Sequence, residues 1–309
     1  MTSAICTLFE SDHHYGVGAL CNSLFAGGYR GTVYAGYRGS LPPWAAGAVR
    51  TDGYSELAVA PEFRVRFVPL ATKVHFTYYK SDFMLGLWQD HCPNTDALFY
   101  FDPDITVSCR WSFFAEWVEC GVALCADVNA DMPASHPLRH AWMRYFGPYG
   151  FQVTHHRDTY FNGGFIGVSK PNCGFLQTWR RLIQLLEPAV GGLQNLVVSD
   201  RSSLFHTPDQ DALNVAAMTC KEPISCVGQD GMDLQWGGGG YIMRHAVGNP
   251  KPWRKKFLWS TLTKGQPPAR ADKAYFRNAS SPIRLYHPLP LSFKKADLLA
   301  GSALGRYIR

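Results

Sequence analysis

The hydrophobic and polar positions of this chain alternate between short strand-like runs and longer helix-like runs. Residues 4–9 form a short apolar run, residues 17–29 have helical apolar spacing, and residues 31–37 read as a second strand. Short apolar strands separated by amphipathic helices are typical of α/β sheets with crossover connections. The opening of the chain therefore predicts a doubly wound, Rossmann-like α/β sheet.

The same alternation continues to about residue 218. From residue 237 onward the chain is rich in Gly and Pro, and we expect it to be loop-like. The helix that opens at residue 172 is expected to end before Pro188. The further predicted helices are 74–88, 111–119, 172–187 and 207–218, and the further predicted strands are 97–101, 120–128 and 159–169, the last entered through a turn.

Composition places the chain among folded globular proteins. Of its 309 residues, 46% are hydrophobic and 17% are charged, which excludes a disordered chain. Its nine cysteines form no CxxC pair, and no signal peptide or apolar run of about 18 residues is present. These features predict reduced thiols in a cytoplasmic protein.

Positive charge is concentrated at the end of the chain. Residues 1–253 carry 18 Lys and Arg against 22 Asp and Glu, a net charge of −4, whereas residues 254–309 carry 12 against 2, a net charge of +10. Aromatic residues stand among these basic ones, which suits an anionic membrane surface or, equally, an extension packed along the main domain. No nucleic-acid-binding motif accompanies the charge, so we expect no nucleic-acid partner. We therefore divide the chain into a main domain, 1–253, and a basic aromatic C-terminal extension, 254–309.

The first candidate for chemistry is Asp102-Pro103-Asp104, which follows the predicted strand 97–101. Residues i and i+2 of an extended chain face the same side, and a proline favours extended geometry in the residue before it. Both carboxylates then face one point at the carboxyl end of a strand, where α/β sheets bind ligands. Oxygen ligands of this kind suit Mg²⁺ or Mn²⁺. Taken alone, the motif also fits an ordinary acidic turn.

The segment "HAVGNPKPW", residues 245–253, supplies an imidazole and a lysine. His245 can complete a metal shell with two aspartates and favours Mn²⁺. Lys251, which stands between two prolines, can meet a phosphate oxygen as a point charge. A proline-stiffened surface loop explains the same residues structurally.

Two further motifs have structural as well as functional interpretations. In "FNGGF", residues 161–165, the glycines allow a ligand to approach the backbone beside Asn162, or they form a tight turn into a strand. In "TPDQDALN", Thr207 and Gln210 match a capping box, and Pro208 suits the first helical position. Capping explains nearly all of the second motif, although a helix N-terminus that faces a sugar is the functional alternative.

The order of these motifs resembles that of the retaining glycosyltransferases of family 8, the group that includes glycogenin and the bacterial lipooligosaccharide galactosyltransferases. The resemblance covers roughly residues 4–253, and the element HxxGxxKPW at 245–253 is its most specific part. It implies the GT-A fold, a Rossmann-like mixed sheet flanked by helices. The basic tail is similar in character to the C-terminal tails of the lipooligosaccharide enzymes, which implies a position on the inner face of a membrane.

The resemblance also implies roles for individual residues. Asp102, Asp104 and His245 would bind Mn²⁺ or Mg²⁺, which would hold the diphosphate of a UDP-sugar. Two matches are looser, because the segment between Lys80 and Asp102 is longer than usual and the loop "ESDHHYGVGAL" departs from the family pattern. The remaining implied roles are nucleotide or diphosphate binding for Thr7, Leu8, Tyr15 (stacked on uracil), Lys80, Pro103, Gly248 and Lys251, and contact with the transferred sugar for Asn162, Asp209, Gln210 and, more weakly, Asp127.

The implied reaction moves a hexose from the UDP-sugar to a sugar or other hydroxyl acceptor with retention at the anomeric carbon. Gln210, implied to lie near the reacting carbon, is a poor nucleophile, which favours a front-face reaction over double displacement. One alternative is a catalytically idle protein that binds a nucleotide sugar. A sugar nucleotidyltransferase is less favoured, because "ESDHHYGVG" has no Lys or Arg. Residues 129–158 match no motif and leave the acceptor open.

Overall fold

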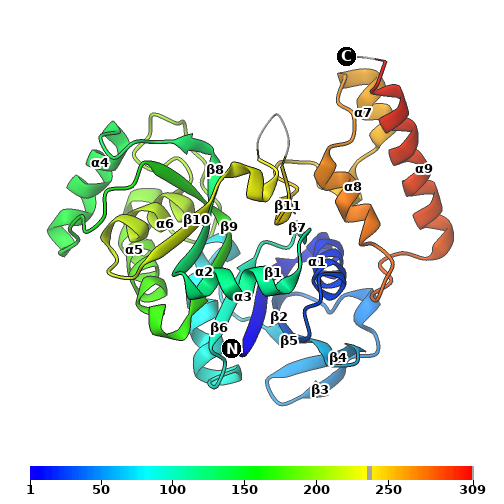
Figure 1. The fold of residues 1–309 in the computed structure, drawn as a ribbon, viewed down its shortest axis with the longest axis horizontal. Coiled ribbons are helices and arrows are strands. Elements are labelled where there is room, and N and C mark those ends of the chain that lie inside the picture. The colour runs from blue at the N-terminus through cyan, green and yellow to red at the C-terminus, as the bar shows by residue number, and fades with distance from the viewer. Residues whose placement is uncertain (235–238, 308–309) are drawn as a thin grey trace. The chain divides into compact units, whose positions relative to one another are not determined.

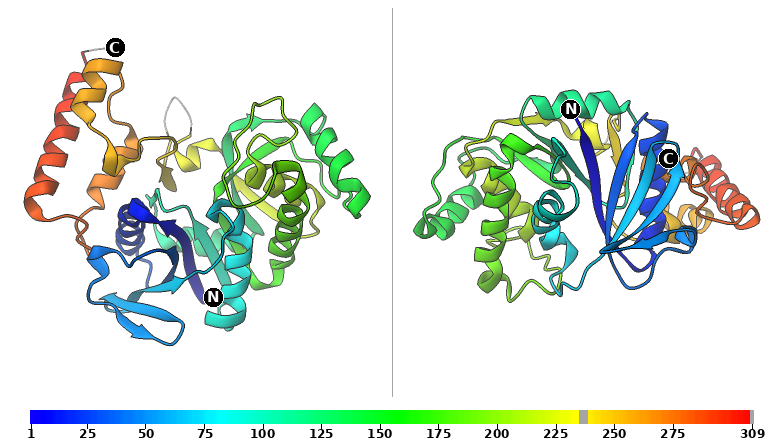
Figure 2. Two further views of the ribbon diagram at one scale, coloured as in Figure 1. Left: turned by 180° about the vertical axis from the view of Figure 1, so that it is seen from behind. Right: turned by 90° about the horizontal axis from the view of Figure 1, so that it is seen from below.

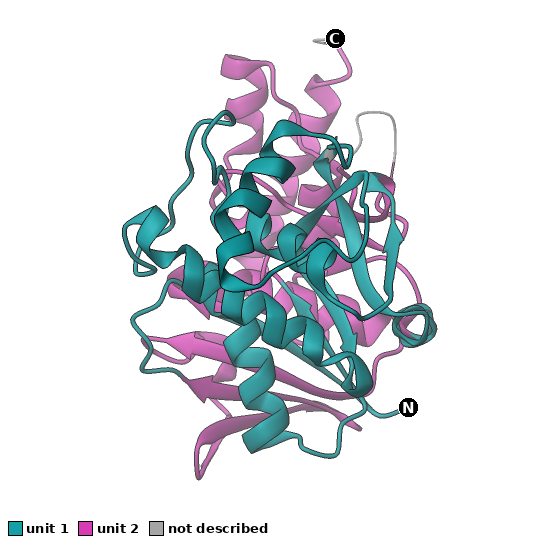
Figure 3. Ribbon diagram, turned by 90° about the vertical axis from the view of Figure 1, so that its left-hand side faces the viewer, with its two compact units in different colours: residues 1–8, 70–101, 112–229 teal, residues 9–69, 102–111, 230–309 magenta. Residues whose placement is uncertain are grey.

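The structure, a computed structural model, describes residues 1–234 and 239–307 (Figure 1). These residues form two compact units, each discontinuous in sequence (Figure 3). Part of the predicted Gly-rich loop 237–240 and the end of the predicted extension 254–309 lie outside the described residues, and the division at residue 253 stays a prediction. Unit 1 contains residues 1–8, 70–101 and 112–229, and unit 2 contains residues 9–69, 102–111 and 230–309.

Unit 1 contains a mixed sheet with the strand order β10-β8-β9-β6-β1. β1 pairs with β6, and β8 with β10, in parallel, whereas β9 is antiparallel to both β6 and β8. All five residues of β6 are buried, as expected of a strand that is apolar on both faces. The bounds of the strands are Ser3–Glu10 for β1, Ala97–Phe101 for β6, Val122–Asp131 for β8, Thr159–Ser169 for β9 and Ile224–Val227 for β10.

Helices α2, α3, α5 and α6 of unit 1 follow the predicted apolar spacing, with a difference at the end of α5, whereas α4 lies in the segment 129–158 for which no element was predicted. Helix α5 continues through Pro188 and ends at Gly191, whose φ of 75° is left-handed. The prediction that it ends before Pro188 was wrong, because a proline in the last turn removes only one hydrogen bond and the glycine is the actual stop. The helices are α2 (Phe76–Gly86, then a π-helical turn Leu87–His91), α3 (Trp111–Glu119, whose first residue belongs to unit 2), α4 (Pro137–Phe146), α5 (Gly174–Val190) and α6 (Pro208–Thr219).

Unit 2 contains α1 (His14–Ala26) and strands in the order β2-β5-β4-β3. β2 is parallel to β5, and the other two pairs are antiparallel. A separate antiparallel pair joins β7 (Ile105–Val107) to β11 (Met243–His245). The first four strands are β2 (Gly31–Arg38), β3 (Val49–Thr51), β4 (Tyr54–Ala60) and β5 (Phe63–Pro69).

The end of the chain is helical, not loop-like as predicted. It forms α7 (Phe257–Lys264), α8 (Arg270–Arg277) and α9 (Pro288–Leu304), and α7 packs beside α9 (Figures 1 and 2). Its prolines lie between these helices or in the first turn of α9, where a missing N–H breaks no intrahelical bond. Of its aromatic side chains, Tyr275 and Phe276 are buried, whereas Trp259 and Phe293 are 63% and 68% exposed.

Two chemical features complete the description. None of the described helices is both long and apolar enough to cross a membrane. The nine cysteines, all of which the structure describes, form no disulfide.

Candidate functional site

Unit 2 brings together the three predicted metal ligands. Asp104 directly precedes β7, and His245 ends β11, where it pairs with Ile105 of β7. This ladder places His245 Nε2 at 3.2 Å from Asp104 Oδ1 and 3.8 Å from Asp102 Oδ2. One ligand atom from each of the three side chains lies within 4.8 Å of the others. The predicted convergence of these residues is confirmed.

Electrostatic coupling shifts the pKa values of Asp104 and His245 in opposite directions. Lys251 Nζ donates a hydrogen bond to Asp104 Oδ2 at 2.5 Å and another to the carbonyl oxygen of Ala246 at 3.1 Å. Burial alone would raise the pKa of Asp104, but His245 and Lys251 lower this pKa far below its usual range. Burial alone would lower the pKa of His245, but the carboxylates of Asp104 and Asp102 raise it. Asp104 is therefore ionised and is held between the imidazole of His245 and the ammonium group of Lys251.

The donor set fits a divalent cation. Two carboxylates and one imidazole match the ligand preferences of Mn²⁺, and the oxygen ligands also suit Mg²⁺. The Nδ1 atom of His245 is buried without a hydrogen-bond partner among the described residues. Metal-binding imidazoles usually donate a hydrogen bond from their second ring nitrogen, and no described residue accepts one here. The site can hold a metal through Asp102, Asp104 and His245.

Two positioning residues of this group were missed by the sequence analysis. Gly16 lies in the first turn of α1, and a Cβ atom there would lie 2.1 Å from the carbonyl oxygen of Pro103. Only glycine therefore lets this helix approach the turn between the two aspartates. The carboxylate of Asp12 accepts hydrogen bonds from Trp253 Nε1 at 3.0 Å and Arg254 Nη2 at 2.5 Å. Neither contact has a sequence signal, because each joins residues far apart in the chain.

The predicted nucleotide-binding residues occupy varied settings. Tyr15 lies in the first turn of α1, not in the expected loop, and its ring stacks on Tyr286 at a centroid distance of 5.0 Å. Gly248 has a left-handed φ of 87°, which favours glycine, and a Cβ atom added there would meet nothing within 4 Å. Thr7 and Leu8 are buried in the part of β1 that belongs to unit 1, and Thr7 Oγ1 lacks a hydrogen-bond partner among the described residues. Their nucleotide-binding roles stay predictions.

Unit 1 gathers the predicted sugar-contact residues into one buried polar cluster. Lys80 Nζ donates to the carbonyl oxygen of Gly163 at 2.8 Å and lies 3.9 Å from Asp209 Oδ2. The N–H of Gly163 in turn donates to Gln210 Oε1 at 2.8 Å. Asn162, which precedes Gly163 on β9, donates from Nδ2 to Oδ2 of Asp127 on the neighbouring strand β8 at 2.6 Å. Lys80, whose match was looser, is thus part of this cluster.

The turn predicted at "FNGGF" and the capping box predicted at Thr207 were wrong, whereas Pro208 is the first residue of α6 as predicted. "FNGGF" is not a turn but lies inside β9. There the N–H of Gly163 donates to Gln210 Oε1, and the N–H of Gly164 donates to Asn162 Oδ1. Thr207 makes no side-chain capping bond, so the capping box is absent. Instead, Asp211 Oδ2 accepts the N–H of Thr207 at 3.0 Å, and Gln210 faces β9. A different local bond thus replaces the predicted capping box, while Gln210 makes a tertiary bond to β9.

Comparisons with known proteins bear on this fold. No protein-family model and no curated protein sequence matches the chain. Among solved structures, the apo WbbM bifunctional glycosyltransferase matches 95% of this chain with a TM-score of 0.56 and 14% identity, over 51% of its own length. The glycosyltransferase GlyE of Streptococcus pneumoniae TIGR4 matches 96% of this chain with a TM-score of 0.50 and 12% identity, over 64% of its own length.

A third similar structure has nearly the length of this chain. It is the galactosyltransferase LgtC in complex with donor and acceptor sugar analogs, which matches 94% of this chain over 99% of its own, with a TM-score of 0.51 and 14% identity. By contrast, the chain spans about half of WbbM and less than two thirds of GlyE. At sequence identities this low, the structural similarity establishes a shared fold and nothing more. The chain has the GT-A fold of these glycosyltransferases, as its resemblance to family 8 predicted.

Proposed function

We propose that the protein is a metal-dependent retaining hexosyltransferase that moves a hexose from a UDP-sugar to a carbohydrate or other hydroxyl acceptor. One observation carries the proposal: Asp102, Asp104 and His245 converge within a GT-A fold. Mn²⁺ or Mg²⁺ is the proposed cofactor, because two carboxylates and an imidazole are suitable ligands.

The proposed roles in unit 2 concern the diphosphate. When bound, the metal would supply positive charge that stabilises the diphosphate as a leaving group. Lys251 would add a second positive charge at the same place, since its ammonium group already lies 2.5 Å from Asp104 Oδ2. Gly248, with open space around it, would allow the backbone to approach a phosphate.

The proposed roles in unit 1 concern the transferred sugar and favour a front-face reaction. A double displacement needs a carboxylate nucleophile. Asp127 accepts hydrogen bonds on both oxygens, from Asn129 and Asn162, and Asp209 lies 3.9 Å from the ammonium group of Lys80. These contacts engage the carboxylate oxygens that a nucleophile would use, and Gln210 is an amide. Trapping a covalent glycosyl adduct on Asp127 or Asp209 would overturn this mechanism.

A thermal-shift panel tests the function. The protein is heated with UDP-, GDP-, CMP- and dTDP-sugars, each in Mn²⁺ and in EDTA. We expect one UDP-sugar to raise the unfolding midpoint in Mn²⁺ only, and we expect Asp104→Asn to abolish this shift. The matched control is Asp52→Asn, at an exposed carboxylate in a different part of unit 2. If none of the nucleotide sugars shifts the unfolding midpoint, or if a shift is the same in EDTA, the metal assignment is overturned.

Hydrolysis of the UDP-sugar without acceptor separates a transferase from an idle binding protein. A competent transferase is expected to release UDP slowly in Mn²⁺ and not in EDTA. Binding without any hydrolysis or transfer would instead support the catalytically idle alternative.

We further propose a cytoplasmic location with residues 254–309 on the inner face of a membrane. The support is the net charge of +10 together with exposed apolar side chains on α7 and α9.

A further inference from the structure

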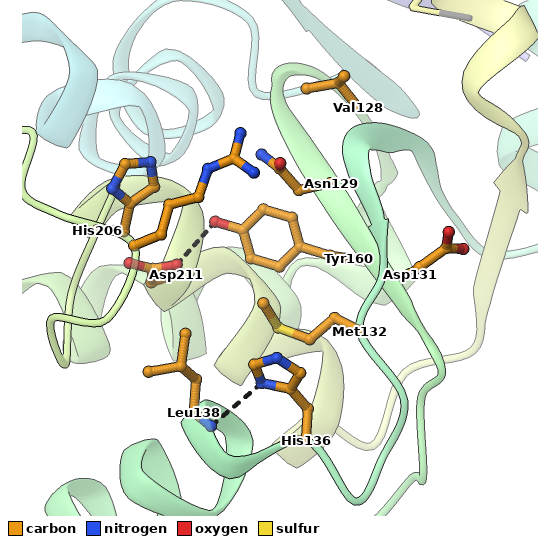
Figure 4. Close-up of a pocket in the computed structure, with 10 residues that line it drawn as sticks. Val128, Asn129, Asp131, Met132, His136, Leu138, Tyr160, His206 and Asp211 are labelled. Carbon is orange, nitrogen blue, oxygen red and sulfur yellow. Dashed lines mark hydrogen bonds between the residues drawn. The ribbon is translucent and has the colours of Figure 1, made fainter.

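Unit 1 contains a cavity of about 300 Å³, a volume that accommodates a sugar ring (Figure 4). Its walls come from the end of β8, the segment that leads into α4, the start of β9, the loop before α6 and the first turns of α6. The polar residues of its lining are Asn129, Asp131, His136, Tyr160, Arg201, His206 and Asp211.

Two residues of the cavity wall bind the predicted sugar-contact cluster. Asn129 Nδ2 donates to Asp127 Oδ1 at 3.1 Å, and the other oxygen of that carboxylate accepts from Asn162. Tyr160 donates to Asp211 Oδ1 at 2.7 Å, as the dashed line in Figure 4 marks, and Asp211 directly follows Gln210 on α6. The cavity therefore adjoins the cluster that is proposed to hold the transferred sugar.

The two imidazoles of the wall present opposite hydrogen-bonding atoms. His136 Nδ1 accepts the N–H of Leu138 at 3.2 Å, so the neutral ring carries its proton on Nε2 and donates there. His206 Nδ1 contacts the carbonyl oxygen of Ser199, which can only accept, so the neutral ring carries its proton on Nδ1 and accepts at Nε2. These backbone contacts fix one donor and one acceptor on the wall.

The charges of the wall are mixed. The guanidinium of Arg201 is accompanied by the carboxylates of Asp131 and Asp211, while Met132 and Leu138 add apolar surface. A ligand of a single charge would face a like charge on this wall, whereas a sugar hydroxyl both donates and accepts. Mixed donors, acceptors and apolar surface favour a neutral polyhydroxyl ligand.

We propose that this cavity binds the acceptor and that the acceptor is a neutral saccharide, an inference that rests on the proposed transferase function. The acceptor hydroxyl would reach the transferred sugar from the Tyr160–Asp211 side of the cavity. His136 would donate to one sugar hydroxyl, and His206 would accept from another.

A tryptophan placed on the wall tests the inference. Val128 lines the cavity and is 50% exposed, so Val128→Trp obstructs it without disturbing the core. The matched control is Val198→Trp, at a 62% exposed position of the same unit that does not line the cavity. Thermal unfolding midpoints of the two variants check that both fold. The probes are methyl β-glucoside, methyl β-galactoside, lactose and, as an anionic counterpart, glucuronate.

Binding is measured by saturation-transfer NMR, and transfer from the UDP-sugar is measured with Mn²⁺. We expect at least one neutral probe to bind and to be glycosylated by the unaltered protein and by Val198→Trp, and we expect at least tenfold weaker binding by Val128→Trp. Unchanged binding by Val128→Trp, preference for glucuronate, or binding of none of the probes would overturn the inference.

Acceptor-free hydrolysis of the UDP-sugar by the unaltered protein distinguishes the two levels of proposal. If hydrolysis occurs but no neutral saccharide binds, the inference fails and the proposed function stands. If a saccharide binds in the cavity but no UDP-sugar is hydrolysed or transferred, the proposed function fails and the acceptor role of the cavity fails with it.

Discussion

Each buried carboxylate of the two sites has a different partner, and the partner determines what the carboxylate can do. His245 and Lys251 lower the pKa of Asp104 and so stabilise its carboxylate as an anion, the form that binds a metal ion. Asp127 is held by the amides of Asn129 and Asn162, which keep it oriented. Buried carboxylates without such partners would protonate instead of ionising.

Replacing Gly16 by alanine should damage the metal group. The new Cβ atom would lie 2.1 Å from the carbonyl oxygen of Pro103, so the turn between the two aspartates must shift. We expect Mn²⁺ affinity, followed by thermal shift or by titration of the electron paramagnetic resonance signal, to fall at least tenfold. Gly86→Ala is the matched control, because a Cβ atom at that helical glycine meets nothing within 4 Å. Equal Mn²⁺ affinity in the two variants would show that α1 does not position the turn.

Asp211→Asn should change how stability depends on pH. Burial raises the pKa of Asp211 from 3.8 to about 6, so the folded state holds this proton more tightly than the unfolded state does. A raised carboxyl pKa contributes stability at low pH that is lost as the pH rises through the folded value. Relative to the unaltered protein, the variant should therefore gain up to about 3 kcal/mol in free energy of unfolding between pH 4 and pH 7.

Urea unfolding of both proteins across that pH range measures the difference. Asp52→Asn, at an exposed carboxylate, is the control. A stability difference for Asp211→Asn that stays constant with pH would contradict the assigned titration.

At the scale of the elements, the short β7–β11 pair creates the metal group. Three backbone-paired residues on each strand are enough to hold His245 beside Asp104. Helix α1 packs against β7 in the same unit, and the side chain of Asn22 on α1 is wholly buried. Small elements thus position the group, because their register determines which side chains meet.

Asn22→Ala should destabilise the attachment of the C-terminal helices to α1. Asn22 Nδ2 donates to the carbonyl oxygens of Asn278 and Ile283 at 2.7 and 2.8 Å, and its Oδ1 accepts the N–H of Ile283 at 2.7 Å. Alanine leaves these backbone groups without partners, so we expect a loss of about 3 kcal/mol or more in free energy of unfolding. Asn172→Ala, which removes one half-buried bond to Ser169, should cost less than about 1 kcal/mol. Equal losses in urea unfolding would contradict the role of Asn22.

At the scale of the whole molecule, charge and exposed apolar surface coincide in one segment. Residues 254–309 carry a net charge of +10 against −4 for the rest of the chain. Some of their aromatic side chains are buried, as packing along the main domain requires, whereas others are exposed, as membrane contact requires. The structure accommodates both interpretations of the sequence through different residues.

Vesicle binding distinguishes these interpretations. We expect the protein to sediment with vesicles that contain anionic phospholipid and not with neutral ones, and we expect added salt to weaken this binding. The double variant Trp259→Ser with Phe293→Ser should bind less, because both side chains are more than 60% exposed. Tyr149→Ser, at a 45% exposed aromatic in unit 1, is the control. Failure of the protein to bind anionic vesicles would leave packing as the only role of the segment.

The sequence alone determined the periodic elements and the chemistry that depends on short spacing. Strands such as 97–101 and helices such as 111–119 were predicted at their observed bounds, because side-chain periodicity is a local property of the backbone. The two carboxylates of Asp102 and Asp104, one residue apart, and the histidine–lysine element at 245–253 were recognisable for the same reason.

The tertiary structure decided which distant residues the side chains of these local elements contact. Asp12 reaches Arg254 across 242 residues, and the capping pattern at Thr207 gave way to the contact of Gln210 with β9. The helices α7 to α9 appeared where prolines predicted loops, because a proline at a helix start costs no hydrogen bond. Contacts of this kind depend on which surfaces the fold brings together, and no local pattern records that choice.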